Sequence, residues 1–177
     1  MRLKAPLTLF ILVVVLTLFS YKAGAASVIK EWDFTDRATM SEWKTSFLWE
    51  QNNSRQGIVE WSSSFGGSAR LYVSGAPCVI NFWRTLPFDL EWGDLIRVEF
   101  STKSYLHPIS GFDLILGPAE PYGHKQSLQV SVDHAGSFVV ELPIYYYWAI
   151  NGTPIGLHFA VWPGTAELYI RKIVILR

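Results

Sequence analysis

The feature that most constrains the fold of this chain is an alternation of apolar and polar side chains with a period of two residues. In one segment Ile96, Val98 and Phe100 alternate with polar or charged neighbours. The pattern recurs in residues 28–34, 112–116, 128–132, 138–142 and 157–161. Such alternation puts one face of an extended strand against a core and the other in solvent. Turns rich in glycine and proline separate the segments, so the sequence predicts short antiparallel strands.

The last predicted strand, residues 166–176, changes register partway along its length. Leu168 and Ile170 share one parity and therefore one face of the strand. Ile173 has the opposite parity, yet it is as apolar as the other two. A β-bulge near residues 171–172 would absorb this slip, because a bulge adds one residue to one strand of a pair.

These patterns predict a single all-β domain over residues 26–177, with the architecture of an antiparallel jelly-roll β-sandwich. We expect one short helical turn within residues 35–43, where Thr35 or Asp36 is placed to cap it. No internal repeat and no low-complexity linker divides the domain. A signal or anchor helix is expected to precede it.

Residues 1–25 have the layout of a signal peptide. Arg2 and Lys4 precede the apolar run 7–19, and Ala23-Gly24-Ala25 offers small residues at the −3 and −1 positions of a cleavage site. An uncleaved membrane anchor is the alternative, because the apolar run approaches the about 20 residues that a spanning helix needs. Both alternatives predict an exported domain, extracellular or at the cell surface, with membrane contact only through an uncleaved segment.

The charge and cysteine content exclude several classes of partner and scaffold. Without residues 1–25 the chain holds 12 basic and 15 acidic residues, and no run of lysine and arginine. This balance argues against nucleic acid and anionic membranes as partners. Cys78 is the single cysteine, so no disulfide framework is possible within one chain. Its apolar neighbours predict a buried thiol, with intermolecular pairing as the alternative.

We expect no catalytic site, metal site or cofactor. Glu31 and Asp33 fall on one face of the first strand, with Asp36 close behind, which resembles the acid cluster of some β-sandwich glycosidases. Asp36 lies beyond the strand, in an expected turn, so a solvated face on an edge strand is the preferred interpretation. Four histidines lack the spacing of metal ligands: His107, His124, His134 and His158.

Several segments together resemble a known group of proteins. These are Glu31-Trp32-Asp33-Phe34 followed by Trp43, the strand 67–73, the turn and strand 90–100, and the closing strand 164–175. Their order resembles that of jelly-roll carbohydrate-binding modules and, more broadly, of galactose-binding-like sandwiches. The resemblance implies a binding module rather than an enzyme. The structural calcium of those modules is not expected here, because Arg171, followed by Lys172, stands where the family often carries an aspartate, and these cations would repel a metal ion.

The aromatic residues are the better indication of function. The chain has eight tryptophans, of which Trp32, Trp43 and Trp92 are predicted to lie in or at the edge of the core. The others lie beside polar residues or next to the expected loop 151–154, as in Trp49, Trp61, Trp83 and Tyr145-Tyr146-Tyr147-Trp148. Consecutive residues of a strand face opposite ways, so some of these rings are expected to meet solvent or a partner.

We therefore predict that the domain binds a glycan or a glycan-like extracellular ligand. Trp83, Tyr146 and Trp148 are the predicted stacking platforms, because aromatic rings offer an apolar face to a sugar ring. Asn81, Arg70 and His158 are the candidate polar contacts. The alternative is a structural surface subunit that self-associates as a homo-oligomer, since an exposed apolar patch can also be a subunit interface.

Overall fold

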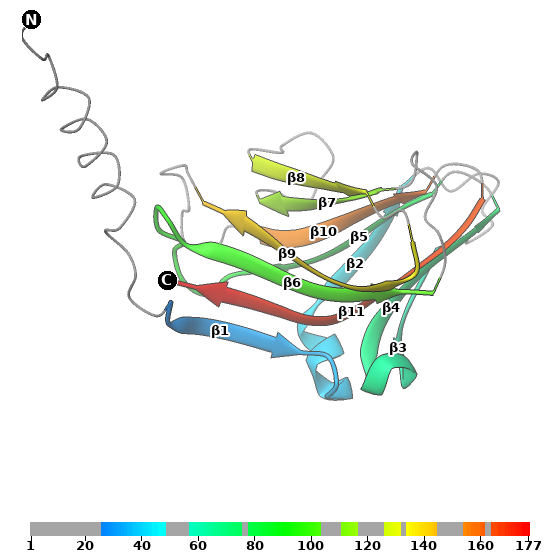
Figure 1. The fold of residues 1–177 in the computed structure, drawn as a ribbon, viewed down its shortest axis with the longest axis horizontal. Coiled ribbons are helices and arrows are strands. Elements are labelled where there is room, and N and C mark those ends of the chain that lie inside the picture. Colours follow the sequence, from blue (N-terminus) through cyan, green and yellow to red (C-terminus); the bar gives the residue numbers. More distant parts are fainter. Residues whose placement is uncertain are drawn as a thin grey trace, which may run out of the picture.

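The computed structural model describes residues 26–48, 57–75, 78–103, 111–116, 126–131, 134–144, 154–161 and 164–177. Within these ranges two antiparallel sheets pack face to face (Figure 1). The six-stranded sheet holds β1 (Val28–Asp33), β3 (Gly57–Ser62), β4 (Ser68–Gly75), β6 (Leu95–Thr102), β9 (Gly136–Pro143) and β11 (Gly164–Leu176). The five-stranded sheet holds β2 (Lys44–Leu48), β5 (Cys78–Thr85), β7 (Gly111–Leu116), β8 (Gln126–Ser131) and β10 (Pro154–Val161). The predicted jelly-roll β-sandwich is confirmed.

The long strand β11 lies in the middle of the larger sheet, in which the strand order is β3-β4-β11-β6-β9. On the side away from β6, β11 pairs first with β4 and then with β1. The register with β6 shifts between Ile170 and Lys172, which leaves Arg171 as the extra residue and confirms the predicted bulge. The backbone N–H of Phe34, just after β1, donates to the Arg171 carbonyl at 2.9 Å.

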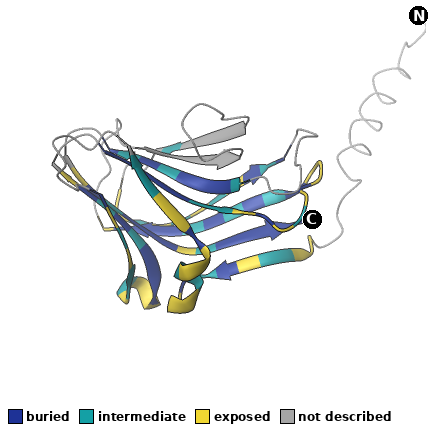
Figure 2. Cartoon of the chain, turned by 180° about the vertical axis from the view of Figure 1, so that it is seen from behind, coloured by how far each residue is buried: buried dark blue, intermediate teal, exposed yellow. Residues whose placement is uncertain are grey.

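The core between the sheets contains large aromatic side chains. Phe34, Phe82 and Phe159 have no exposed surface. Trp43 stacks on Phe82 with ring centroids 4.8 Å apart and meets Trp32 edge to face at 5.6 Å. The predicted core positions of Trp32 and Trp43 are therefore confirmed, and Figure 2 shows buried residues along strands of both sheets.

The predicted core position of Trp92 is wrong, because 53% of the residue is exposed. Trp92 occupies the turn before β6, next to Gly93 with a φ of 89°. A turn has no two-residue alternation, so the apolar character of Trp92 did not indicate whether its side chain is buried. Cys78, in contrast, is fully buried, which confirms the predicted thiol in the core.

The expected helical turn is present as a 3-10 helix, η1 (Arg37–Glu42). Asp36 caps it by accepting a hydrogen bond from the Ala38 N–H at 2.8 Å. A second 3-10 turn, η2 (Ser64–Gly66), was not predicted, and it holds Phe65 at a φ of 57°. In Figure 2 these two turns carry much of the exposed surface at one end of the sandwich.

The predicted signal or anchor segment at residues 1–25 lies outside the described residues, and so do Trp49, Tyr146 and Trp148. Within the described ranges, no helix has the length and hydropathy that crossing a membrane requires. The division of the chain at residue 26 stays a prediction.

Candidate functional site on the five-stranded sheet

The outer face of the five-stranded sheet carries three of the predicted ligand-binding residues. The strand order is β2-β5-β10-β7-β8, so β5 and β10 lie side by side inside the sheet. Along β5, Ile80 and Phe82 point into the core. Asn81 and Trp83 alternate with them and share the outer face, as predicted. His158 on β10 is directly opposite Asn81.

Trp83 is half-buried, although it lies on the outer face. Lys44 of β2 pairs with it on one side, and the Lys44 Nζ lies 5.0 Å from the centroid of the indole ring. Gly156 of β10 pairs with it on the other side. A Cβ atom on Gly156 would lie 2.6 Å from the Trp83 Cβ and 2.7 Å from the Phe82 carbonyl oxygen. The absence of a side chain at position 156 therefore leaves room for Trp83.

A row of hydrogen-bonded side chains crosses the same face at the level of Asn81, two residues before Trp83. Asn81 Nδ2 donates to the Ser46 hydroxyl at 3.3 Å, and Asn81 Oδ1 accepts from His158 Nδ1 at 2.9 Å. Asn81 is 3% exposed, while Ser46 and His158 are half-buried. Because both ends of its amide have partners, Asn81 holds its two neighbours in defined positions beside the Trp83 ring.

The structure does not bring Arg70 to this face. Arg70 lies on β4, in the six-stranded sheet, with its guanidinium 2.6 Å from Glu60 of β3 and 3.0 Å from Glu167 of β11. It also lies 4.5 Å from the centroid of the Tyr72 ring. Arg70 and Trp83 both point outward, but from opposite sheets of the sandwich.

Tyr146 and Trp148 lie outside the described residues. The strand that follows them in the sequence, β10, is described. β10 begins at Pro154, which is paired with Thr85 at the end of β5. Thr85 is two residues beyond Trp83. β10 therefore begins at the end of β5 nearest to Trp83.

Sequence reasoning missed three neighbours on the outer face: Lys44, Ser46 and Gly156. Gly156 gave a usable signal, because a glycine inside a strand often marks a close approach of neighbouring groups. Lys44 and Ser46 gave none, because their pairing with β5 depends on tertiary contacts between strands that are about 35 residues apart.

The acidic residues that resembled a glycosidase cluster have structural partners. Lys172 Nζ lies 3.0 Å from Glu31 and 3.8 Å from Asp33. Asp33 Oδ1 also accepts hydrogen bonds from the backbone and hydroxyl of Thr35. Asp36 caps η1. Among the residues that the structure describes, no group of three or more histidine, cysteine or acidic residues is placed to hold a metal ion.

Comparisons with known proteins connect this fold to a structural class. No protein family matches the sequence, and no curated protein matches it. A solved carbohydrate-binding module, studied for its specific recognition of mannan, superimposes with a TM-score of 0.53 at 12% identity. The match covers 87% of this chain and 99% of that one. The chain has the jelly-roll fold of carbohydrate-binding modules.

Two further solved structures share the fold. Modules of the β-sandwich superfamily, described as having promiscuous specificity, match with a TM-score of 0.56 at 13% identity over 88% of this chain and 64% of that one. The enzymatically active domain of tailspike protein 4 from bacteriophage CBA120 matches with a TM-score of 0.53 at 16% identity. That match covers 78% of this chain but only 20% of the tailspike chain. The jelly roll therefore occurs both as a separate module and within larger proteins.

Proposed function

We propose that this protein is a non-catalytic module that binds glycans on the outer face of its five-stranded sheet. The observation that carries the proposal is the half-buried Trp83 ring, held between Lys44 and Gly156 on a face that also displays hydrogen-bonding side chains. Sugar rings present C–H faces that pack on an indole and hydroxyl groups that need polar partners. A tryptophan ring beside a polar row meets both requirements.

The polar contacts of the proposed site come from His158, Ser46 and Lys44. Asn81 is too deeply buried to offer much surface, so its role is to position His158 and Ser46. Tyr146 and Trp148 extend the proposed platform, which the entry of β10 beside Trp83 supports. Arg70 belongs to the opposite sheet and is not part of this site.

Export and the absence of catalysis are also proposed. The basic residues, apolar run and small residues of positions 1–25 support export to the extracellular space or cell surface. The structural partners of Glu31, Asp33 and Asp36 support a role without hydrolysis. Mass spectrometry of protein recovered from a secreting host tests cleavage after Ala25. Polysaccharide hydrolysis that is lost in Glu31→Gln would contradict the non-catalytic role.

The binding proposal is tested by Trp83→Ala, with Trp92→Ala as the matched control. Trp92 is the same residue type and is 53% exposed, but it lies in the turn before β6. Affinity electrophoresis against mannan, galactan, xylan and mixed-linked β-glucan measures retention by each polysaccharide. We expect at least a tenfold loss of affinity in Trp83→Ala, about 1.4 kcal/mol, and no loss in Trp92→Ala. Circular dichroism confirms that both variants are folded.

Equal retention of the wild type and Trp83→Ala on every polysaccharide that binds would remove Trp83 from the site. The alternative prediction of a self-associating subunit has its own readout in the same samples. Light scattering that shows concentration-dependent oligomers, with no polysaccharide raising the melting temperature, would favour that alternative, because a ligand that binds only the folded state stabilises it.

A further inference from the structure

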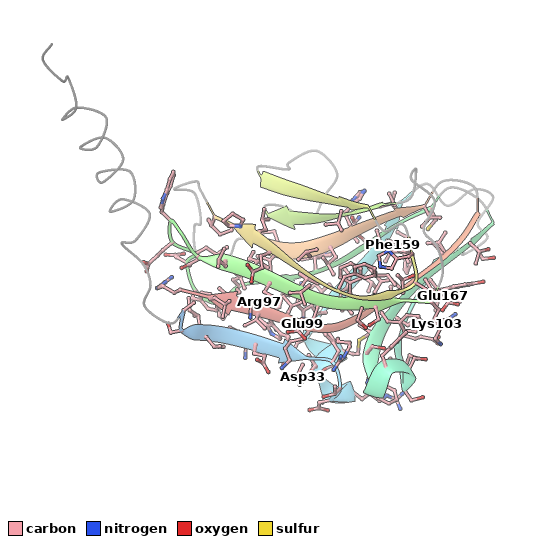
Figure 3. The ribbon with its side chains drawn as sticks, in the orientation of Figure 1. Asp33, Arg97, Glu99, Lys103, Phe159 and Glu167 are labelled. Atoms are coloured by element: carbon pink, nitrogen blue, oxygen red, sulfur yellow. The ribbon has the colours of Figure 1, made fainter. Side chains whose placement is uncertain are left out.

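A second candidate site lies on the outer face of the opposite, six-stranded sheet. It is a shallow surface depression, open to solvent, with a volume of about 530 Å³; it is called the cavity below and is bordered by β3, β4, β11, the η2 turn and the end of β6. Cavities that bind small ligands have volumes of roughly 300–1,000 Å³. Figure 3 shows Lys103 and Glu167, two of its lining residues, close together at one end of the sheet.

The floor of this cavity is built around the Arg70 side chain. Arg70 forms ion pairs with Glu60 and Glu167, and Glu167 also accepts a hydrogen bond from the Tyr169 hydroxyl. Burial raises the pKa of Glu167, but the hydrogen bonds from Tyr169 and Arg70 outweigh burial and hold it below its ordinary value. The carboxylate therefore stays ionised at neutral pH and keeps a fixed orientation.

The rim of the cavity is held in a defined conformation. Lys103 Nζ donates to the Ser64 hydroxyl at 3.1 Å and lies 4.8 Å from the centroid of the Tyr169 ring. Phe65, 38% exposed, packs against the same ring at 5.1 Å. Its φ of 57° is a conformation that residues other than glycine adopt rarely.

The cavity is lined by an aromatic ring and by both hydrogen-bond donors and hydrogen-bond acceptors. Trp61 lines the cavity, and its indole N–H donates to the Phe34 carbonyl oxygen at 3.0 Å, which fixes the ring. Serines occupy positions 62–64 beside it. The two cations, Arg70 and Lys103, are matched by two carboxylates. An anion would be repelled by the carboxylates and a metal ion by the cations, whereas a neutral polyol finds donors and acceptors for its hydroxyl groups.

We infer that this cavity is a second ligand site, which takes a neutral saccharide unit. It is independent of the proposed face around Trp83, because the two sites lie on opposite outer faces of the sandwich. A chain with both sites could engage two glycan strands at once, and the second contact would raise the overall affinity through effective concentration.

The test uses the full chain from a secreting host in the Trp83→Ala background, so that the proposed face does not contribute. The Trp61 indole N–H resonance is followed by ¹⁵N NMR during titration with mannotriose, cellotriose and xylotriose. We expect a saturable shift with at least one trisaccharide. Adding Ser63→Trp, which places a bulky ring at an exposed lining position, should weaken this binding at least tenfold. Ser74→Trp, at an exposed position elsewhere on β4, should leave it unchanged.

Three outcomes would overturn the inference. They are the absence of a saturable shift with all three trisaccharides, a shift that persists in Ser63→Trp, and saturable binding of inorganic phosphate in place of the sugars. If Ser63→Trp does not fold, Glu60→Gln decides the question. This substitution keeps the size of the side chain and removes one carboxylate of the lining, so unchanged trisaccharide affinity would also overturn the inference.

Discussion

At the scale of single residues, Gly156 decides how Trp83 is presented to solvent. The two residues are directly opposite each other on adjacent antiparallel strands. Any side chain at position 156 would occupy space that the Trp83 Cβ and the Phe82 carbonyl already fill. The glycine is therefore needed for packing, although its backbone has no unusual φ angle.

Gly156→Ala is expected to lower the free energy of unfolding by about 1–3 kcal/mol, the usual cost of inserting a methyl group into a packed site. It should also weaken polysaccharide binding, because Trp83 must shift to make room. The control is Gly136→Ala, where the added Cβ would lie 3.6 Å from its nearest neighbour, an ordinary contact. Urea denaturation measures both variants. Equal stability of the two would show that the strands adjust freely at position 156.

At the scale of elements, one cluster of side chains connects β1, η1 and β5. The Arg84 guanidinium of β5 lies 4.6 Å from the centroid of the Trp32 ring of β1 and pairs with Glu42 of η1. The Trp32 indole N–H also donates to Glu42, at 3.2 Å. Because β1 and β5 belong to different sheets, this cluster joins the two layers.

Arg84→Gln should therefore cost more stability than an ordinary surface substitution. It removes a cation–π contact and a charge-assisted hydrogen bond from a partly buried site, so we expect a loss of about 1–2 kcal/mol. The control is Arg97→Gln, which breaks the more exposed pair with Glu141 and should cost less than about 1 kcal/mol. Thermal and urea denaturation compare the two. A larger loss in Arg97→Gln would contradict the role of the cluster.

At the scale of the whole molecule, several carboxyl groups make stability depend on pH. Burial raises the pKa of Asp33, but hydrogen bonds from Thr35 and the nearby charges of Lys172 and Arg171 together lower it below its ordinary value. A hydrogen bond from Arg84 lowers the pKa of Glu42 below its ordinary value, and the pKa of Glu167 is lowered as well. These groups bind protons more weakly in the folded chain than in the unfolded chain, so acid favours unfolding.

The free energy of unfolding should therefore be fully retained above about pH 5 and fall as the pH drops through the lowered pKa values of these carboxyl groups. Urea denaturation at a series of pH values from neutral to about 3 measures this dependence. Glu42→Gln should show a shallower decrease, because one of the contributing carboxyl groups is gone. Stability that stays constant, or rises, as the pH is lowered would contradict the assignment.

The sequence by itself determined the architecture and the direction in which many side chains point. Alternation predicted the strands, the parity change predicted the bulge at Arg171, and the shared parity of Asn81 and Trp83 placed them on one face. These features could be predicted because successive side chains of a strand point to opposite faces of the sheet. The apolar side chains recur every two residues because one face is buried in the core. The exposure of Trp92 could not be predicted in this way, because Trp92 lies in a turn and a turn has no such periodicity.

Only the tertiary structure decided which outward-facing residues lie together. Arg70 and Trp83 were predicted to share a ligand, yet the strand order places them on opposite sheets. The same order pairs Trp83 with Lys44 and Gly156, and Arg70 with Glu60 and Glu167. Periodicity separates inside from outside, but it does not specify the sheet. The sheet to which a strand belongs depends on its pairing with strands that are distant in the sequence. This pairing is set only when the inner faces of the two sheets are buried against each other.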